Sequence, residues 1–160
     1  MANAMTALAT ITLGASQATV TFSSISGAYR DLRLVVVGRT ATNLINIQFN
    51  ADTGANYYWV NMVGDGTNAT STSAGPQTQI QFPNMDSTVN NLLVDILDYS
   101  ATDKHKTALA RMNAPTTSGT VALAGRWAST SAITSLTVSG VGGNVWAIGS
   151  TFTLYGIVSA

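Results

Sequence analysis

The sequence has no cysteine and no glutamate, and only one histidine and three prolines in 160 residues. Without cysteine there can be no disulfide scaffold, no thiolate nucleophile and no sulfur-ligated metal. A single histidine cannot build a multi-histidine metal site within one chain. We therefore expect no catalytic residues, no metal-ligating residues and no cofactor-binding residues, and a protein that is not an enzyme.

Charge is also scarce. Lysine and arginine total seven, aspartate supplies all seven acidic residues, and charged residues make up 9% of the chain, against about 25% in typical soluble domains. A neutral chain has no electrostatic attraction for a polyanion, so nucleic acid is not an expected partner. Exposed positions are instead filled by 23 threonines, 15 serines and 12 asparagines. Such a surface resists self-association poorly, so we expect a protein that packs against neighbouring molecules, with a weakly charged monomer as the alternative.

Long apolar runs are missing as well. The longest, residues 34–37, has only four members and lies between Arg33 and Arg39, whereas a membrane helix needs about 20. The first nine residues carry no basic segment and no continuous apolar segment, unlike a secretion signal. These features predict a soluble chain with no membrane partner, made in a cytoplasm.

Alternation of apolar and polar residues with period two dominates the sequence and predicts strands with one buried face. The expected strands are residues 9–13, 19–22, 32–37, 45–49, 57–62, 79–82, 89–97, 107–112, 120–127, 133–138 and 152–157. Glycine and asparagine turns separate them at intervals that favour a sandwich or barrel. Residues 32–37, apolar on both sides, predict a strand buried on both faces. No convincing helix is found, and residues 101–112 stay undecided.

The chain length fits one domain. We expect an N-terminal extension over residues 1–10, followed by a single β-sandwich domain over residues 11–160. Residues 1–8, which include small apolar side chains, are expected to become ordered only against a partner by adding backbone hydrogen bonds at a sheet edge. Residues 67–75, rich in Thr, Ser, Asn, Ala and Gly, predict a flexible loop.

Three polar features invite a catalytic interpretation. Asp52-Thr53-Gly54 matches the turn of aspartic proteases, in which two carboxylates share a proton, but its polar surroundings favour an ordinary turn. Asp95 and Asp98 would point to opposite faces of a strand, so we expect no carboxylate pair there. Asp95 shares a face with Leu93 and Leu97, so it is expected to be either hydrogen-bonded or ion-paired, an arginine being one option. His105 lies in the most charged stretch, and no nucleophile elbow accompanies it, so a solvated loop tip is expected.

The aromatic residues allow two interpretations. Trp59, Trp127 and Trp146, with five tyrosines, could line a carbohydrate-binding groove, or they could fill the core of a sandwich. The glycosylation sequon at Asn68 has little meaning without a secretion signal. The glycine-rich residues 140–143 precede no helix that could hold a phosphate, and they predict a hairpin loop.

Four segments carry a resemblance to structural proteins of tailed-bacteriophage virions. Residues 29–36 (Tyr-Arg-Asp-Leu-Arg-Leu-Val-Val) resemble an opening that leads into an apolar strand, and residues 49–57 resemble that group's Phe-Asn-x-Asp turn. Residues 127–136, followed by residues 149–157 with Leu-Tyr-Gly near the end, resemble the finish of such proteins. The likeness extends from about residue 11 to residue 157.

The resemblance implies a jelly-roll-like fold, so the expected fold class is an all-β, antiparallel β-sandwich. It also implies a homotrimer in the virion, assembled in the host cytoplasm. Only about ten residues precede the first expected strand, with no fibre shaft. This favours a capsid decoration (cement) protein that stabilises the head through the major capsid protein.

Two other functions are weighed against this one. The alternative is a tail or head fibre module that binds host-surface carbohydrate through Trp and Tyr. A glycan hydrolase would require paired carboxylates in one groove. The chain has no glutamate and its aspartates are scattered, so the sequence disfavours this function.

Overall fold

Two antiparallel sheets of unequal size lie face to face in the computed structural model, which describes residues 4–41, 44–83, 85, 87–114 and 119–158. The larger sheet has the order β1 (Met5–Thr12), β12 (Thr151–Ile157), β3 (Asp31–Gly38), β8 (Asn90–Leu97), β9 (Lys106–Ala114), β10 (Gly119–Trp127), β5 (Tyr57–Gly64) and β6 (Ala69–Gln77). The smaller sheet has the order β2 (Thr19–Phe22), β11 (Leu136–Gly140), β4 (Ile45–Phe49) and β7 (Ile80–Phe82).

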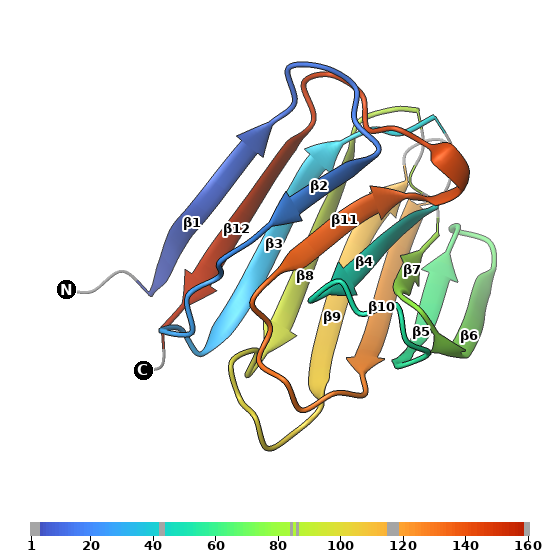
Figure 1. The fold of residues 1–160 in the computed structure, drawn as a ribbon. Helices are drawn as coiled ribbons and strands as arrows, with labels where there is room; N and C mark the ends of the chain where they lie inside the picture. The colour runs from blue at the N-terminus through green and yellow to red at the C-terminus, as the bar shows by residue number, and fades with distance from the viewer. Residues whose placement is uncertain (1–3, 42–43, 84, 86, 115–118, 159–160) are drawn as a thin grey trace.

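The chain passes repeatedly between the two sheets, and the smaller one covers only one face of the larger one (Figure 1). The expectation of an all-β, antiparallel β-sandwich is confirmed. The only helix in the described part of the chain is a single 3-10 turn at Val141–Gly143, and none there is long and apolar enough to cross a membrane.

The core lies between the sheets and follows directly from the period-two pattern. Each central strand of the larger sheet turns every second residue inward, as Leu32, Leu34 and Val36 do on β3, because successive side chains of a strand point to opposite faces. Two of the three tryptophans, Trp127 and Trp146, are buried in this core. They are therefore closed to a carbohydrate ligand.

Two segments of the resemblance meet across one end of the larger sheet. Gly156 on β12 lies so close beneath the ring of Tyr29 that any β-carbon there would collide with it. Next to this contact, Asp31 opens β3 and pairs in register with Ile157. Tyr29 of the first segment therefore packs directly on Gly156 of the last segment.

The other two segments meet through hydrogen bonds. The side-chain oxygen of Asn50 accepts the backbone N–H groups of Thr134 (2.8 Å) and Ser135 (3.1 Å), and its amide donates to the carbonyl of Ala132 (2.7 Å). Asp52 accepts the indole N–H of Trp127 at 2.7 Å. These residues hold the loop before β11 against the turn after β4.

Four expectations about the chain trace differ from the structure. Residues 67–75, expected as a flexible loop, mostly belong to edge strand β6. Residues 1–10, expected as an extension, enter the sheet at Met5, where β1 pairs with β12. Strand β3 is buried on one face only, because Val37 is exposed on the other. Residues 140–143, expected as a hairpin loop, instead connect strands of different sheets.

Tyr57 makes the free energy of unfolding depend on pH in the alkaline range. Its hydroxyl donates to the carbonyl of Phe49 and accepts that residue's N–H, at 3.1 and 3.0 Å. Burial raises the pKa of Tyr57 from 10.0 to about 12. The folded chain therefore keeps this proton at pH values where the unfolded chain has lost it, so the stabilisation is complete below pH 10 and disappears as the pH rises to about 12.

We expect the free energy of unfolding to fall by about 2–3 kcal/mol between pH 10 and pH 12 through this one group, since each pKa unit corresponds to about 1.4 kcal/mol. Urea unfolding of the wild type and of Tyr57→Phe across this range measures it. Other groups that titrate there act equally in both proteins. An identical pH slope in the two proteins would show that Tyr57 does not titrate with this shift.

Candidate functional site: the open face of the eight-stranded sheet

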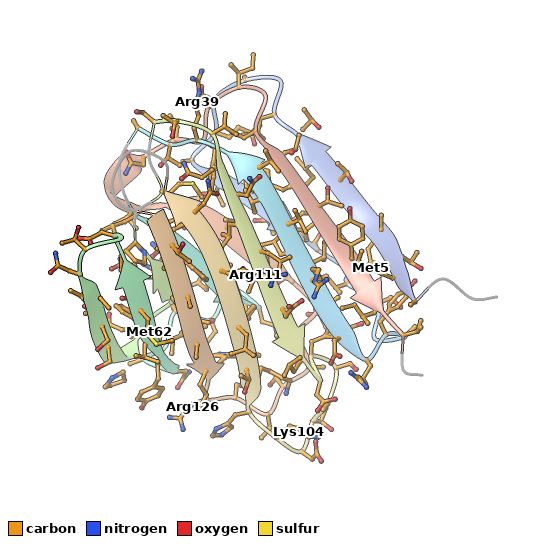
Figure 2. All side chains as sticks on the ribbon, turned by 180° about the vertical axis from the view of Figure 1, so that it is seen from behind. Met5, Arg39, Met62, Lys104, Arg111 and Arg126 are labelled. Carbon is orange, nitrogen blue, oxygen red and sulfur yellow. The ribbon has the colours of Figure 1, made fainter. Side chains whose placement is uncertain are left out.

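The outer side of the eight-stranded sheet is covered by no other element in the described part of the chain (Figure 2). We call its outward side chains the open face. In register across the strands they are Thr153, Val35, Leu93, Arg111, Ala122, Met62 and Ser71 in one row, Tyr155, Arg33, Asp95, Leu109, Ala124, Val60 and Ser73 in the next, and Leu97, Thr107, Arg126 and Tyr58 in a third.

The open face has the size of a protein interface. Eight strands about 4.8 Å apart, each contributing about seven residues at 3.3 Å, cover roughly 800 Å². This is about one partner's share of a standard interface.

Exposed apolar side chains lie on the central strand β9 and on β5. Leu109 is 47% exposed and Met62 55% exposed, and Val60 lies on β5 in the row of Leu109, two residues from Met62. Around them the face is hollowed. One groove of about 580 Å³ runs along Tyr58, Val60, Ser73 and Arg126, and two smaller hollows of about 480 and 440 Å³ lie beside Arg111 and Met62.

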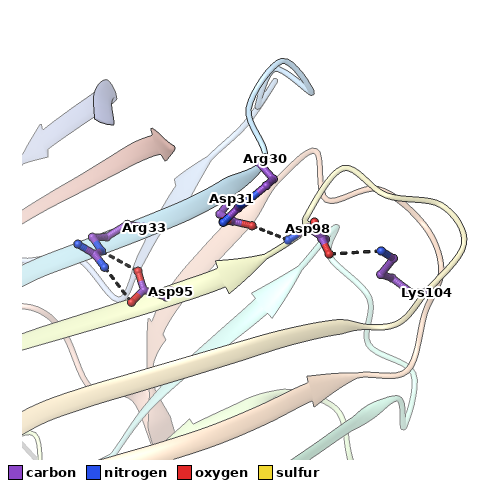
Figure 3. A network of polar contacts seen from close by, with 6 residues as sticks. All are labelled: Arg30, Asp31, Arg33, Asp95, Asp98 and Lys104. Atoms are coloured by element: carbon purple, nitrogen blue, oxygen red, sulfur yellow. Dashed lines mark hydrogen bonds and ion pairs between the residues drawn. The ribbon is translucent and has the colours of Figure 1, made fainter. Parts of the chain in front are cut away.

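The charges on and around the open face fall into two groups, and Figure 3 shows the first, the ion-paired residues. Arg33 binds Asp95 through two hydrogen bonds of 2.6 and 3.0 Å, which confirms the expected arginine partner of Asp95. The hydrogen bonds that Arg33 donates to Asp95 raise the pKa of Arg33.

At the end of the sheet, Arg30 pairs with the buried Asp31, which also accepts the N–H of Asp98 at 2.9 Å. Asp98 in turn pairs with Lys104 at 3.3 Å.

The second group consists of Arg111 and Arg126, which have no carboxylate within ion-pair distance among the described residues. Both are exposed, and Figure 2 shows them on the open face at two different heights of the sheet. The guanidinium of Arg126 lies 4.3 Å above the ring of Tyr58, and that ring rests against Gly75. The open face therefore carries two cations that no carboxylate of the described residues pairs with.

The other residues with a catalytic interpretation do not meet on this face. Asp52 stays a structural turn residue: the indole of Trp127, then the amide of Asn56, hold its pKa below the usual value. His105 is exposed in the loop before β9, as expected. Asp95 and Asp98 are engaged in separate ion pairs.

The only buried lysine among the described residues, Lys106, was not singled out from the sequence. Its ammonium donates to the carbonyls of Lys104 (2.8 Å) and Thr130 (3.3 Å), and burial lowers its pKa. It is closed to solvent, so it holds a loop and touches no ligand. The described residues contain no group of His, Cys, Asp and Glu that could hold a metal ion.

A smaller cleft lies at the side of the sandwich, between β7 and the inner face of β5 and β6. It has a volume of about 340 Å³ and an uncharged lining that includes Trp59, Asn61, Thr72 and Gln81. Trp59 is the one tryptophan that is only partly buried.

No family model matches the chain, and no curated protein matches it. Among solved structures it is similar to alginate lyase Aly36B, with a TM-score of 0.35, 9% identity, and coverage of 91% of this chain and 78% of that chain. A mutant of this lyase in complex with alginate tetrasaccharide gives a TM-score of 0.27 at 11% identity, covering 87% of this chain and 79% of that one. The binding domain of botulinum neurotoxin serotype G gives 0.25 at 6% identity, covering 96% of this chain and 44% of that one.

The expectation that the chain is not an enzyme is wrong on this finding, because the similar structures include an enzyme. The exclusion rested on the missing cysteine and glutamate, yet tyrosine, lysine and histidine can also transfer protons. TM-scores below 0.5 at about 10% identity carry no argument for a lyase activity of this chain.

Proposed function

We propose that the chain is a capsid decoration protein of a phage virion, which binds the shell through its open face. The observation that supports this most is the open face itself, because it joins an area of interface size to exposed apolar side chains and arginines. Protein interfaces are polar at their rim and enriched in methionine and arginine relative to the rest of the surface. The open face carries the exposed Leu109 and Met62 together with Arg111 and Arg126, and it has threonines and serines on its edge strands.

The edges of the same sheet support contacts between copies of the chain, which we propose to form a homotrimer. Strands β1 and β6 are the outer members of the sheet, and neither contains a charged residue. Charges and prolines on edge strands normally prevent edge-to-edge pairing. Strand β1 lacks both, so its backbone groups are available to a neighbouring chain.

The experiment is a count of copies on purified virions of the phage that encodes the chain. A decoration protein is present in tens to hundreds of copies per particle, so quantitative gels should show a stoichiometry comparable to that of the major capsid protein. A protein found in a few copies at the tail, or absent from the particle, would contradict the proposal.

The alternative is a fibre module that binds host-surface carbohydrate, and the side cleft favours it. Uncharged amides, hydroxyls and a partly exposed indole suit a neutral sugar. A glycan array probed with the wild type and with Trp59→Phe tests it, and binding of a neutral glycan that the variant loses would support the fibre module.

A further inference from the structure

The two unpaired arginines of the open face stand in a fixed geometric relation. Arg126 on β10 lies beside Thr107 on β9, and Arg111 follows four residues further along β9. Four residues of a strand span about 13 Å. Leu109 lies halfway between them and is 47% exposed. Along this line the face presents a cation, an apolar side chain and a second cation.

An extended polypeptide reproduces this spacing. In a strand, residues i, i+2 and i+4 point to the same side, and the first and last are about 13 Å apart. A segment with acidic residues at i and i+4 and an apolar residue at i+2 would place a carboxylate at each guanidinium and its apolar side chain at Leu109. Resting on the Tyr58 ring, the Arg126 guanidinium is held in place before binding.

We propose that the open face binds an extended segment of a protein partner with the pattern acidic-x-apolar-x-acidic. This rests on the proposed function and names the chemistry of the surface that the decoration protein would recognise. The partner must supply the negative charge, because the acidic groups near the face already have cationic partners, Asp95 in Arg33 and Asp31 in Arg30.

A second copy of this chain does not fit the open face. No two of its seven aspartates are four residues apart and it has no glutamate, so the chain lacks the pattern. Two open faces brought together would also oppose arginines to arginines. An acidic polysaccharide fits less well, because the centre of the line is an exposed leucine and the Tyr58 ring is already covered by Arg126.

The probe is the blocked peptide acetyl-Asp-Ala-Leu-Ala-Asp-amide, titrated into the ¹⁵N-labelled full chain at 20 mM NaCl. We expect amide shifts confined to β9, β10 and β5 and a dissociation constant that rises at least fivefold at 200 mM NaCl, because salt screens exposed charge pairs. The double variant Arg111→Gln/Arg126→Gln should weaken binding at least fivefold. Arg39→Gln, which removes an exposed arginine outside the open face (Figure 2), should leave it within twofold.

Two further ligands separate the possible partners. The peptide acetyl-Lys-Ala-Leu-Ala-Lys-amide should cause no shifts on the open face. Tri-galacturonate should bind more weakly than the aspartate peptide. Absence of binding by the aspartate peptide, binding that survives loss of both arginines, or tighter binding of tri-galacturonate would each overturn the inference.

The decoration role and the binding of an acidic segment are tested separately, so either one can fail while the other stands. If virions carry the protein in high copy number but its attachment is indifferent to the double arginine variant and to salt, the acidic segment is wrong and the decoration role stands. If the peptide binds as expected but the protein is absent from virions, the acidic segment stands and the decoration role is wrong.

Discussion

Replacing Asn50 by alanine is expected to lower the free energy of unfolding by about 2–4 kcal/mol, a large loss for a single polar side chain. The change removes four hydrogen bonds of 2.7–3.3 Å that join the turn after β4 to the loop before β11. Each such bond contributes about 1 kcal/mol net. Asn50 also has a φ of 52°, a conformation that asparagine tolerates better than alanine.

Thermal unfolding monitored by circular dichroism measures this loss, with an expected drop in Tm of about 5–15 °C for a chain of this length. The matched control is Ala51→Gly. Ala51 has a similar φ of 51° and is exposed, so glycine should leave the stability unchanged or raise it by up to about 1 kcal/mol. If Asn50→Ala proved as stable as the wild type, the side-chain bonds of Asn50 would not hold the loop.

Replacing Leu109 by aspartate is expected to weaken attachment to the virion shell about 100-fold while leaving the chain folded. The carboxylate would stand at the centre of the open face, where an interface is most fully dehydrated and where single residues contribute most to binding. Because Leu109 is 47% exposed in the free chain, its loss removes little from the core. The cost to the strand itself is about 1 kcal/mol or less.

Co-sedimentation of the labelled protein with particles stripped of their own copies measures the attachment. Ile148→Asp is the matched control, because Ile148 is the most exposed large apolar residue of the described chain, at 61%, and lies in the loop before β12. It should bind like the wild type. Equal binding by Leu109→Asp and Ile148→Asp would mean that the open face does not touch the shell.

The sequence predicted most strands because the buried side of each strand imposes period two on the pattern. The prediction failed for strands that have no well-buried side or whose register is irregular. Strand β6 is the outermost strand, and almost all its side chains are exposed, so Thr, Ser, Ala and Gly follow no alternation. In β1 a register shift between Ala7 and Ala9 separates the first residues of the strand from the alternating pattern that begins at Ala9.

The open face could be predicted only in part. The apolar residues on both sides of β3 predicted a strand buried on both faces, which is wrong because Val37 faces solvent and not a second buried layer. Arg111, Leu109 and Arg126 lie on two strands, and only the register between β9 and β10 brings them into line. A single sequence does not reveal that register. The pairing of Asp95 with an arginine was predictable, since a half-buried carboxylate between apolar neighbours needs a partner.

The most direct measurement is an electron cryo-microscopy map of the intact virion at a resolution that separates the two sheets. We predict that the eight-stranded sheet lies against the shell, with β9 and β10 in contact with the capsid protein and the four-stranded sheet turned outward. A map in which the four-stranded sheet meets the shell, or in which the particle carries no copy of the protein, would contradict the decoration role and its open-face attachment.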